Sequence, residues 1–282
     1  MAELCIMITT ENDFYCDALI DKIQEHLSKD VMLQKDMHYA STIQQALMPR
    51  ERHFKRIFSD YYVLYKPQNI IGGDFYWIGE KDDWKYACVA DCTGHGVAGA
   101  MLSVLGIGYL NYLILGKENL DLGQILKALD EKWIEAFHNV NESVYDNDWM
   151  ELSIVAINTK QKKMRFASAN NNCIVVIDDE VQILKGNNYP IGGWQIEKNR
   201  DYHEKTINLP RGSKIYLGSD GLKDQFGGVK NKKLSFKRIF SFVESNHFLS
   251  FDKQQEKLNT LLLEWKGENL QTDDITLLAL SV

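Results

Sequence analysis

The pattern of apolar and polar positions changes near residue 50 and divides the chain into two parts. Residues 13–48 are rich in charges and helix-forming residues, and their apolar positions recur at loosely helical spacing. Pro49 follows directly, and proline favours a helix end at that point. The pattern predicts one or two amphipathic helices without a core of their own. We therefore expect an N-terminal helical segment over residues 1–50 and a separate domain over residues 51–282.

From Tyr61 onward, short apolar runs rich in β-branched and aromatic residues are separated by polar turns. The runs are YYVLYKP, FYWIGE, KYACVAD, LSIVAIN, MRFASA, CIVVIDD, KIYLGSD and DDITLLALSV. Helices are predicted over about 97–115 and 121–139, and a third near 235–266. Because the strands mostly follow one another instead of alternating with helices, the order predicts an α+β fold.

One tract, from Thr93 to Gly116, carries no formal charge and is long enough to cross a bilayer. It contains six glycines together with His95 and Asn111, and it follows directly on Asp91. These features favour a helix buried in the core of a soluble domain over a membrane span.

Composition narrows the class of protein further. The net charge of −7 and the pI of about 5.6 argue against a nucleic-acid-binding surface, which needs a basic stripe. Five cysteines show neither a CxxC pair nor zinc-ligand spacing, which predicts reduced thiols. The N-terminus lacks the basic and apolar regions of a secretory signal, so we expect a cytoplasmic location.

Aspartates stand at the ends of several predicted strands. Asp74, Asp91 and Asp220 each follow an apolar run and lie close to glycine, and the pair Asp273-Asp274 opens the last strand. A single aspartate at a strand end is usually a turn or helix-capping residue. Several carboxylates that converge cannot all stay ionised without cations, and clustered oxygen ligands suit Mg²⁺ or Mn²⁺. The pattern therefore predicts a metal site at these strand ends.

Other motifs fit the sequence less well. The segment GGDFY is similar to the GGDEF signature of diguanylate cyclases but lacks its glutamate, and GSDG is not a G-x-S-x-G nucleophile elbow. Cys88 and Cys92 have no downstream arginine at the spacing of a phosphate loop, which disfavours a cysteine-based phosphatase. His95 lies between glycines, and we expect it to shape the loop and the helix start more than to act as an acid or base.

Eight ordered segments, from about residue 40 to the C-terminus, together resemble a known family. They are IQQALMP, YKPQNIIGGDFYWI, VADCTGHGVAGAMLS, WMELSIVAIN, ASANNN, YPIGGW, IYLGSDGLKDQFGG and TDDITLLAL. The chain resembles the metal-dependent Ser/Thr protein phosphatases (the PPM or type 2C superfamily). Within them it is similar to the bacterial subgroup of the stage II sporulation E protein and the stress regulator RsbU. The resemblance implies an αββα sandwich, in which helices flank two central antiparallel sheets and the metals bind at one edge.

The resemblance also implies a set of catalytic, metal-coordinating side chains. They are Asp74, Asp91, Asp220 and Asp273. Cys92 would contribute its backbone carbonyl, and Asp274, where eukaryotic relatives often have Asn, would support a ligand. The implied cofactor is a pair of Mn²⁺ or Mg²⁺ ions, which would activate a water for in-line attack on phosphorus.

Some positions depart from the pattern of the relatives. Many of these have Ala-Gly-His-Asn-Pro-Pro where this chain has ASANNN, so Ala169 replaces the histidine, although Asn170 remains. Trp77 stands where many relatives have Asp. Neither change removes an implied metal ligand, which favours an active enzyme over an inactive relative. Lys66 could steer phosphate, or it could be a solvated residue at a strand end.

The resemblance implies hydrolysis of phosphoserine or phosphothreonine on a bacterial regulatory protein, such as an anti-sigma-factor antagonist. The alternative is a non-catalytic binding module that keeps the phosphatase fold. Either residues 1–38 form a minimal regulatory element or a homodimer through N-terminal helices, or this chain is a piece of a larger protein. We expect neither a nucleic-acid partner nor a membrane span in this chain.

Overall fold

The computed structural model describes residues 29–116, 120–138, 148–194, 197 and 199–282. Contacts divide the chain into two compact units, Met1–Ile43 and Gln44–Val282. Residues 29–47 are helical, and the helix ends two residues before Pro49, as the sequence predicts. The helix predicted for residues 13–28 lies outside the described residues. The boundary predicted at residue 50 and the regulatory role of the first segment remain predictions.

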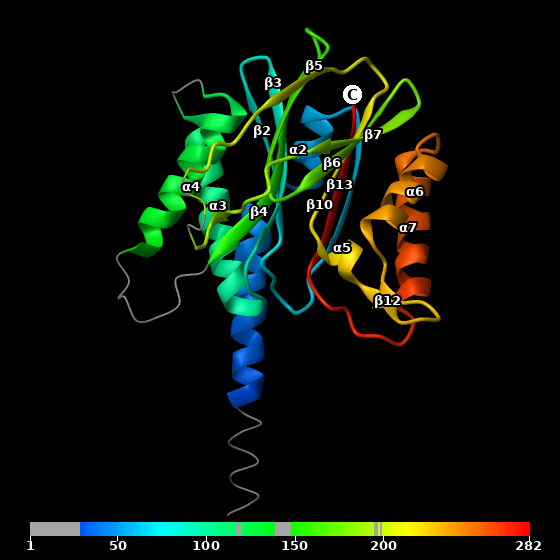
Figure 1. The fold of residues 1–282 in the computed structure, drawn as a ribbon. Helices are drawn as coiled ribbons and strands as arrows, with labels where there is room; N and C mark the ends of the chain where they lie inside the picture. The colour runs from blue at the N-terminus through cyan, green and yellow to red at the C-terminus, as the bar shows by residue number, and fades with distance from the viewer. Residues whose placement is uncertain (1–28, 117–119, 139–147, 195–196, 198) are drawn as a thin grey trace, which may run out of the picture. The chain divides into compact units, whose positions relative to one another are not determined.

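Two antiparallel sheets form the centre of the second unit (Figure 1). The β10 sheet has the order β1 (Asp60–Lys66), β13 (Ile275–Ser281), β10 (Lys214–Gly218), β6 (Asn172–Ile177) and β7 (Glu180–Lys185). The β3 sheet has the order β2 (Phe75–Lys81), β3 (Trp84–Cys92), β4 (Trp149–Asn158), β5 (Lys163–Ala169) and β9 (Lys205–Asn208), and β8 (Ile191–Gly192) pairs with β4. A separate small ladder joins β11 (Phe226–Gly227) and β12 (Lys232–Lys233).

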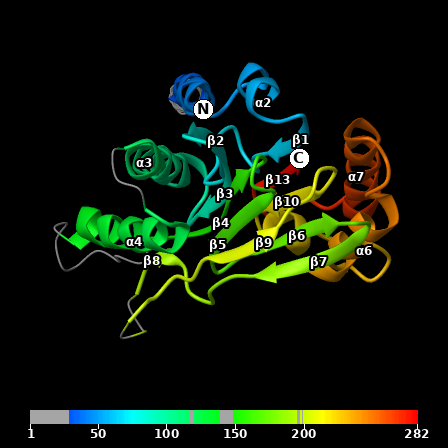
Figure 2. The same cartoon turned by 90° about the horizontal axis from the view of Figure 1, so that it is seen from above.

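Helices cover the outer faces of both sheets (Figure 2). The β3 sheet is covered by α3 (Gly96–Leu115) and α4 (Leu122–His138), and the β10 sheet by α6 (Phe236–Asn246) and α7 (Phe251–Lys266). Two short helices, α2 (Glu51–Ile57) and α5 (Gly221–Asp224), complete the unit. The order helix, sheet, sheet, helix confirms the predicted αββα sandwich.

Three layers of apolar side chains hold the sandwich together. One lies between the two sheets, and the other two lie between each sheet and its pair of helices. Both faces of the central strands are therefore covered, which explains why β4 is buried along nearly its whole length. For the same reason β3 and β4 read in the sequence as continuous apolar runs and not as an alternating pattern.

The structure corrects several details of the predicted elements. The helix predicted near 235–266 is two helices, because the chain turns after Asn246 and a new helix begins at Phe251, whose ring is buried. The apolar pattern of the sequence did not predict α2, β7 or β9. Most residues of β7 and β9 are exposed, as befits strands at the sheet edges, so they carry no clear apolar pattern.

Helix α3 is long and apolar enough to cross a membrane when judged by length and composition alone. In the structure half of this stretch is buried, and Leu102, Ile107 and Leu110 pack in the layer against the β3 sheet. One face of the helix is thus buried in the core, as predicted, while Met101 (66% exposed) and Tyr112 (67% exposed) lie on its outer face.

Candidate metal centre

The four predicted aspartates come together because strand ends from both sheets meet at one edge. Asp74 directly precedes β2, and Asp91 is the second-last residue of β3. Asp220 stands between β10 and α5, and Asp273 lies two residues before β13. Asp91 interacts electrostatically with the other three carboxylates, so the structure places all four in one site.

Asp74 is completely buried, and only one of its carboxylate oxygens has a hydrogen-bond partner. The hydroxyl of Ser219 donates to Asp74 Oδ2 at 2.6 Å, and Ser219 Oγ in turn accepts the backbone N–H of Thr276 at 3.0 Å. Asp74 Oδ1 has no partner. Burial raises the pKa of Asp74 to about 8, because the charged form has lost its hydration. A cation at Oδ1 would satisfy this oxygen.

Asp91 lies in a strongly negative environment, and Asp220 has a buried carboxylate oxygen without a partner. Burial raises the pKa of Asp91 well above its usual value, and the charges of Asp74, Asp220 and Asp273 raise it further. Asp220 Oδ1 is buried without a partner. Divalent ions would relieve both the repulsion and the unsatisfied oxygens.

The carboxylate of Asp274 shapes the loop that carries Asp74. Its Oδ2 accepts the backbone N–H of Gly73 at 2.6 Å, and its Oδ1 accepts that of Gln68, also at 2.6 Å. A Cβ atom at Gly72 would come within 2.2 Å of this carboxylate, so glycine is required there. Both carboxylate oxygens of Asp274 therefore accept backbone N–H groups, and the residue fixes the loop that positions Asp74.

A second close approach brings the same loop to the carbonyl oxygen of Cys92. A Cβ atom at Gly73 would lie 2.5 Å from this oxygen and 2.9 Å from that of Gly94. The thiol of Cys92 is buried among the residues between the β3 sheet and its helices, and burial raises its pKa well above the usual value. The backbone of Cys92 thus faces the Asp74 loop while its sulfur does not take part.

The donor set suits a hard divalent cation. Carboxylate and carbonyl oxygens are the ligands that Mg²⁺ and Mn²⁺ prefer, and two of the carboxylate oxygens have no partner. Among the described residues, no three His, Cys, Asp or Glu side chains are arranged around one point to hold a single ion. An ion bound here would therefore complete its shell with water, as Mg²⁺ commonly does.

Sequence reasoning missed Gln44, whose side chain is 2% exposed and contacts the Asp74 loop. Its Nε2 donates to the carbonyl oxygen of Gly72 at 2.7 Å and to Ser103 Oγ of α3 at 2.8 Å. Gln44 lies near the end of the helix over residues 29–47. It thereby joins this helix end to the loop and to α3. The motif IQQALMP contains the residue but does not show what it touches.

Sequence reasoning also missed Glu151, a buried carboxylate on β4. It accepts a hydrogen bond from Asn170 Nδ2 at 2.5 Å. Burial raises the pKa of Glu151, and the nearby Lys223 opposes this effect. Nothing in the run WMELSIVAIN separates this glutamate from an ordinary strand residue, because its neighbours come from distant segments.

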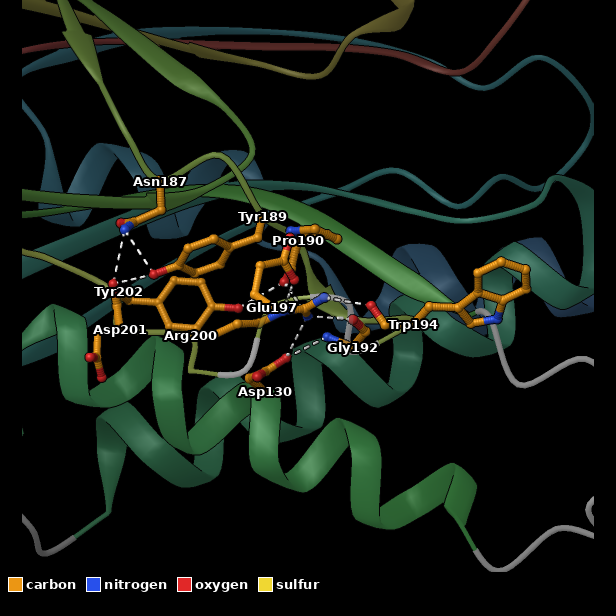
Figure 3. A network of polar contacts seen from close by, with 10 residues as sticks. All are labelled: Asp130, Asn187, Tyr189, Pro190, Gly192, Trp194, Glu197, Arg200, Asp201 and Tyr202. Atoms are coloured by element: carbon orange, nitrogen blue, oxygen red, sulfur yellow. Dashed lines mark hydrogen bonds and ion pairs between the residues drawn. The ribbon is translucent and has the colours of Figure 1, made fainter.

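An arginine-centred network holds β8 against α4 (Figure 3). The side chain of Arg200 is 4% exposed and pairs with Asp130 of α4 at 3.4 Å. It donates to the carbonyl oxygens of Pro190, Gly192 and Trp194. Because β8 pairs with the start of β4, and the N–H of Thr93 donates to Trp149 O there, the network supports the strand end that carries Asp91.

Two further predicted residues have less defined roles. His95 is exposed and stands at the N-cap position of α3, where its side chain makes no capping hydrogen bond. Lys66 ends β1 opposite Ile275, and its carbonyl oxygen accepts a hydrogen bond from Gln271. A role of either side chain toward phosphate remains a prediction.

The fold and the grouped carboxylates define a class of protein, and comparison with known proteins agrees. The SiaA-PP2C domain of Pseudomonas aeruginosa is similar to this chain with a TM-score of 0.79 and 28% identity, over 90% of this chain and 98% of that one. The PP2C phosphatase domain of SpoIIE from Bacillus subtilis, with a fragment of its regulatory domain, gives a TM-score of 0.62 at 16% identity. That match covers 79% of this chain and 62% of the other.

RsbX in complex with magnesium shows the same fold, with a TM-score of 0.54 at 19% identity over 79% of this chain and 94% of that one. The chain thus has the fold of PP2C-type serine/threonine phosphatases. A family model described as stage II sporulation protein E (SpoIIE) matches residues 82–282. The chain therefore belongs to the SpoIIE family. A search among curated proteins found no significant match.

Proposed function

We propose that this protein is an Mn²⁺- or Mg²⁺-dependent phosphatase that removes phosphate from serine or threonine of a bacterial regulatory protein. The observation that carries the proposal is the pair of buried, unpartnered oxygens on Asp74 and Asp220 within one group of carboxylates. Membership of the SpoIIE family and the similarity to the SiaA phosphatase domain support this activity. The substrate class is part of the proposal, and the family resemblance implies an anti-sigma-factor antagonist.

In this proposal each residue of the site has a defined task. Asp74, Asp91, Asp220 and Asp273 would hold two ions, together with the carbonyl oxygen of Cys92. When bound, the ions would activate a water molecule as the nucleophile and would neutralise the charge that develops on the phosphoryl group. Two further side chains prepare the site, because Ser219 orients the carboxylate of Asp74 and Asp274 fixes the loop before it.

The first test is hydrolysis of p-nitrophenyl phosphate and of a phosphoserine peptide by the full chain. We expect hydrolysis of both with Mn²⁺ or Mg²⁺ and none in EDTA, because a divalent ion would supply the positive charge that the buried carboxylates of Asp74 and Asp91 call for. Inhibition by EDTA that added Mn²⁺ reverses would show that the hydrolysis depends on the metal. Absence of hydrolysis with Mn²⁺ bound would favour the alternative of a non-catalytic binding module.

Gln44 is expected to strengthen metal binding, because its side chain holds the loop that carries Asp74. Gln44→Ala removes the amide that holds Gly72 O and leaves this buried carbonyl oxygen without its donor, at a cost of ~1–3 kcal/mol. Part of this cost falls on the Asp74 loop, so we expect the Mn²⁺ concentration for half-maximal activity to rise roughly tenfold. Titration of activity with Mn²⁺ measures this shift.

The matched control for Gln44→Ala is Gln254→Ala, which removes an equally buried glutamine that bonds Tyr216 and the carbonyl oxygen of Leu249. We expect it to lower the melting temperature without changing the Mn²⁺ requirement. Equal Mn²⁺ requirements in the wild type and Gln44→Ala would show that Gln44 has only a structural role.

We propose that the N-terminal unit is a regulatory or dimerising element. Its described helical residues include the exposed apolar side chains Val31, Leu33, Tyr39 and Ile43. Apolar side chains in such number on one short helix suit contact with a partner helix. Homodimerisation through this segment remains a prediction.

A further inference from the structure

Glu151 stands directly beside the candidate metal centre, on the strand next to Asp91. The register of the β3–β4 ladder pairs Asp91 with Glu151, and Glu151 is 7% exposed. Directly opposite residues of an antiparallel pair project from the same face of a sheet, with Cβ atoms about 4.5–5.5 Å apart. The fold therefore brings a fifth carboxylate to the edge where the four aspartates meet.

The turn between β5 and β6 holds Glu151 in place. Asn170 has a positive φ of 53°, a conformation that asparagine tolerates better than most residues, and its Nδ2 donates to Glu151 Oε1. The backbone N–H of Asn170 donates to Asn187 O at 2.9 Å. The next residue, Asn171, donates its Nδ2 to Gly218 O at 2.8 Å, two residues before Asp220. The turn thus fixes Glu151 of one sheet relative to the end of β10 in the other.

Burial is the main reason why the charge of Glu151 is costly, and it raises the pKa of this carboxylate. The hydrogen bond from Asn170 and the charge of Lys223 favour the ionised form, while Asp220 and Asp224 oppose it. A buried charge needs hydrogen-bond donors or cations around it, and a further donor would stabilise Glu151. Water molecules bound to a divalent ion are strong donors, and carboxylates commonly orient such ligands from outside the coordination shell.

We propose that Glu151 is a positioning residue of the metal centre, which accepts a hydrogen bond from ion-bound water while Asn170 holds its carboxylate. The assignment rests on the metal-dependent function proposed above. It gives the carboxylate of Glu151 a task at an edge that already carries four aspartates. It also gives Asn170 in the segment ASANNN a task, which is to hold Glu151, and this task does not need the histidine that many relatives have at position 169.

The decisive variant is Glu151→Gln, which keeps the shape and an acceptor for Asn170 but removes the charge. Two effects of opposite sign are expected. In EDTA the melting temperature should rise above that of the wild type, because one of several like charges is gone. The dissociation constant for Mn²⁺, measured by calorimetry, should rise by about 10–100-fold, as is usual when a partner outside the coordination shell is lost.

Two further variants complete the experiment. Asn170→Ala retains the charge of Glu151 but frees its carboxylate, so we expect a smaller rise in the Mn²⁺ dissociation constant, of a few-fold. It serves as the test if Glu151→Gln does not fold. The matched control is Glu204→Gln, which changes a carboxylate that directly precedes β9 and accepts the backbone N–H of Leu122, the first residue of α4, at 2.9 Å. We expect it to bind Mn²⁺ as tightly as the wild type.

The results separate this inference from the proposed function. If the wild type binds no Mn²⁺, the metal-dependent function is wrong. If the wild type binds Mn²⁺ and both Glu151→Gln and Asn170→Ala bind it within twofold of the wild type, Glu151 is not a positioning residue. If Glu151→Gln lowers the metal-free melting temperature and leaves the affinity unchanged, its role is structural and the inference is overturned.

Discussion

Asp91→Asn is expected to lower the turnover of p-nitrophenyl phosphate by ~10²–10³-fold at saturating Mn²⁺, the scale on which single electrostatic groups contribute to catalysis. The reason is the central position of Asp91, whose carboxylate interacts with those of Asp74, Asp220 and Asp273. Asparagine has nearly the same shape but cannot supply the negative charge that two dications need. Steady-state kinetics over a Mn²⁺ series, together with circular dichroism of the folded variant, measures the effect.

The control for Asp91→Asn is Asp83→Asn, which changes an aspartate just before the other end of the same strand. Asp83 pairs with Lys160 at 2.6 Å and both side chains are mostly exposed, so this ion pair contributes little to stability. We expect unchanged turnover and an unchanged Mn²⁺ requirement. A folded Asp91→Asn protein with the turnover of the wild type would remove Asp91 from the set of metal ligands.

Divalent metal is expected to stabilise the folded protein strongly. Four ionised aspartates carry four negative charges and two dications carry four positive ones, so the filled site is formally neutral. Because the unfolded chain cannot assemble this site, binding stabilises the fold by ~2.7 kcal/mol at a free metal concentration 100-fold above the dissociation constant. For a domain of this size, this corresponds to a rise in melting temperature of roughly 5–10 °C.

Thermal melts in EDTA and over a series of Mn²⁺ and Mg²⁺ concentrations test this expectation without a substrate. Asp91→Asn should melt at a higher temperature than the wild type in EDTA, because it removes one of the mutually repelling carboxylates. It should also lose most of the metal-induced rise. A wild-type melting temperature that stays constant across the metal series would speak against a metal site among these carboxylates.

The local pattern of apolar residues predicted much of the fold. Apolar runs marked the long central strands, and the bounds predicted for α3 and α4 agree with the structure within about one residue. This agreement has a physical cause, since strands buried on both faces and helices packed on a sheet must each show a long, consistent apolar pattern. The ordered motifs, which implied the phosphatase family and the αββα sandwich, are confirmed by the family match and by the fold.

The sequence also marked the aspartates at strand ends, because a strand that ends in Asp beside glycine is visible in one local segment. Their convergence could not be read from any single segment. The aspartates converge for two reasons. The pairing of β1 with β13 and of β10 with β13 brings Asp220 and Asp273 to the same edge of the β10 sheet. The packing of this sheet on the β3 sheet then brings them to Asp74 and Asp91. The structure groups the predicted residues, and their roles as ligands remain predictions.

Only the tertiary structure revealed Gln44, Ser219 and Glu151. Each acts through a partner that is distant in the chain: Gln44 contacts Gly72, Ser219 contacts Asp74, and Glu151 contacts Asn170. A glutamine in an amphipathic helix, a serine after a strand and a glutamate within a strand carry no local signal of such contacts. The sequence by itself thus determined which elements form and which carboxylates end them. The register of the strands and the packing of the two sheets decided which polar side chains hold those carboxylates in place, because hydrogen bonds of this kind depend on atoms that come together only in the folded chain.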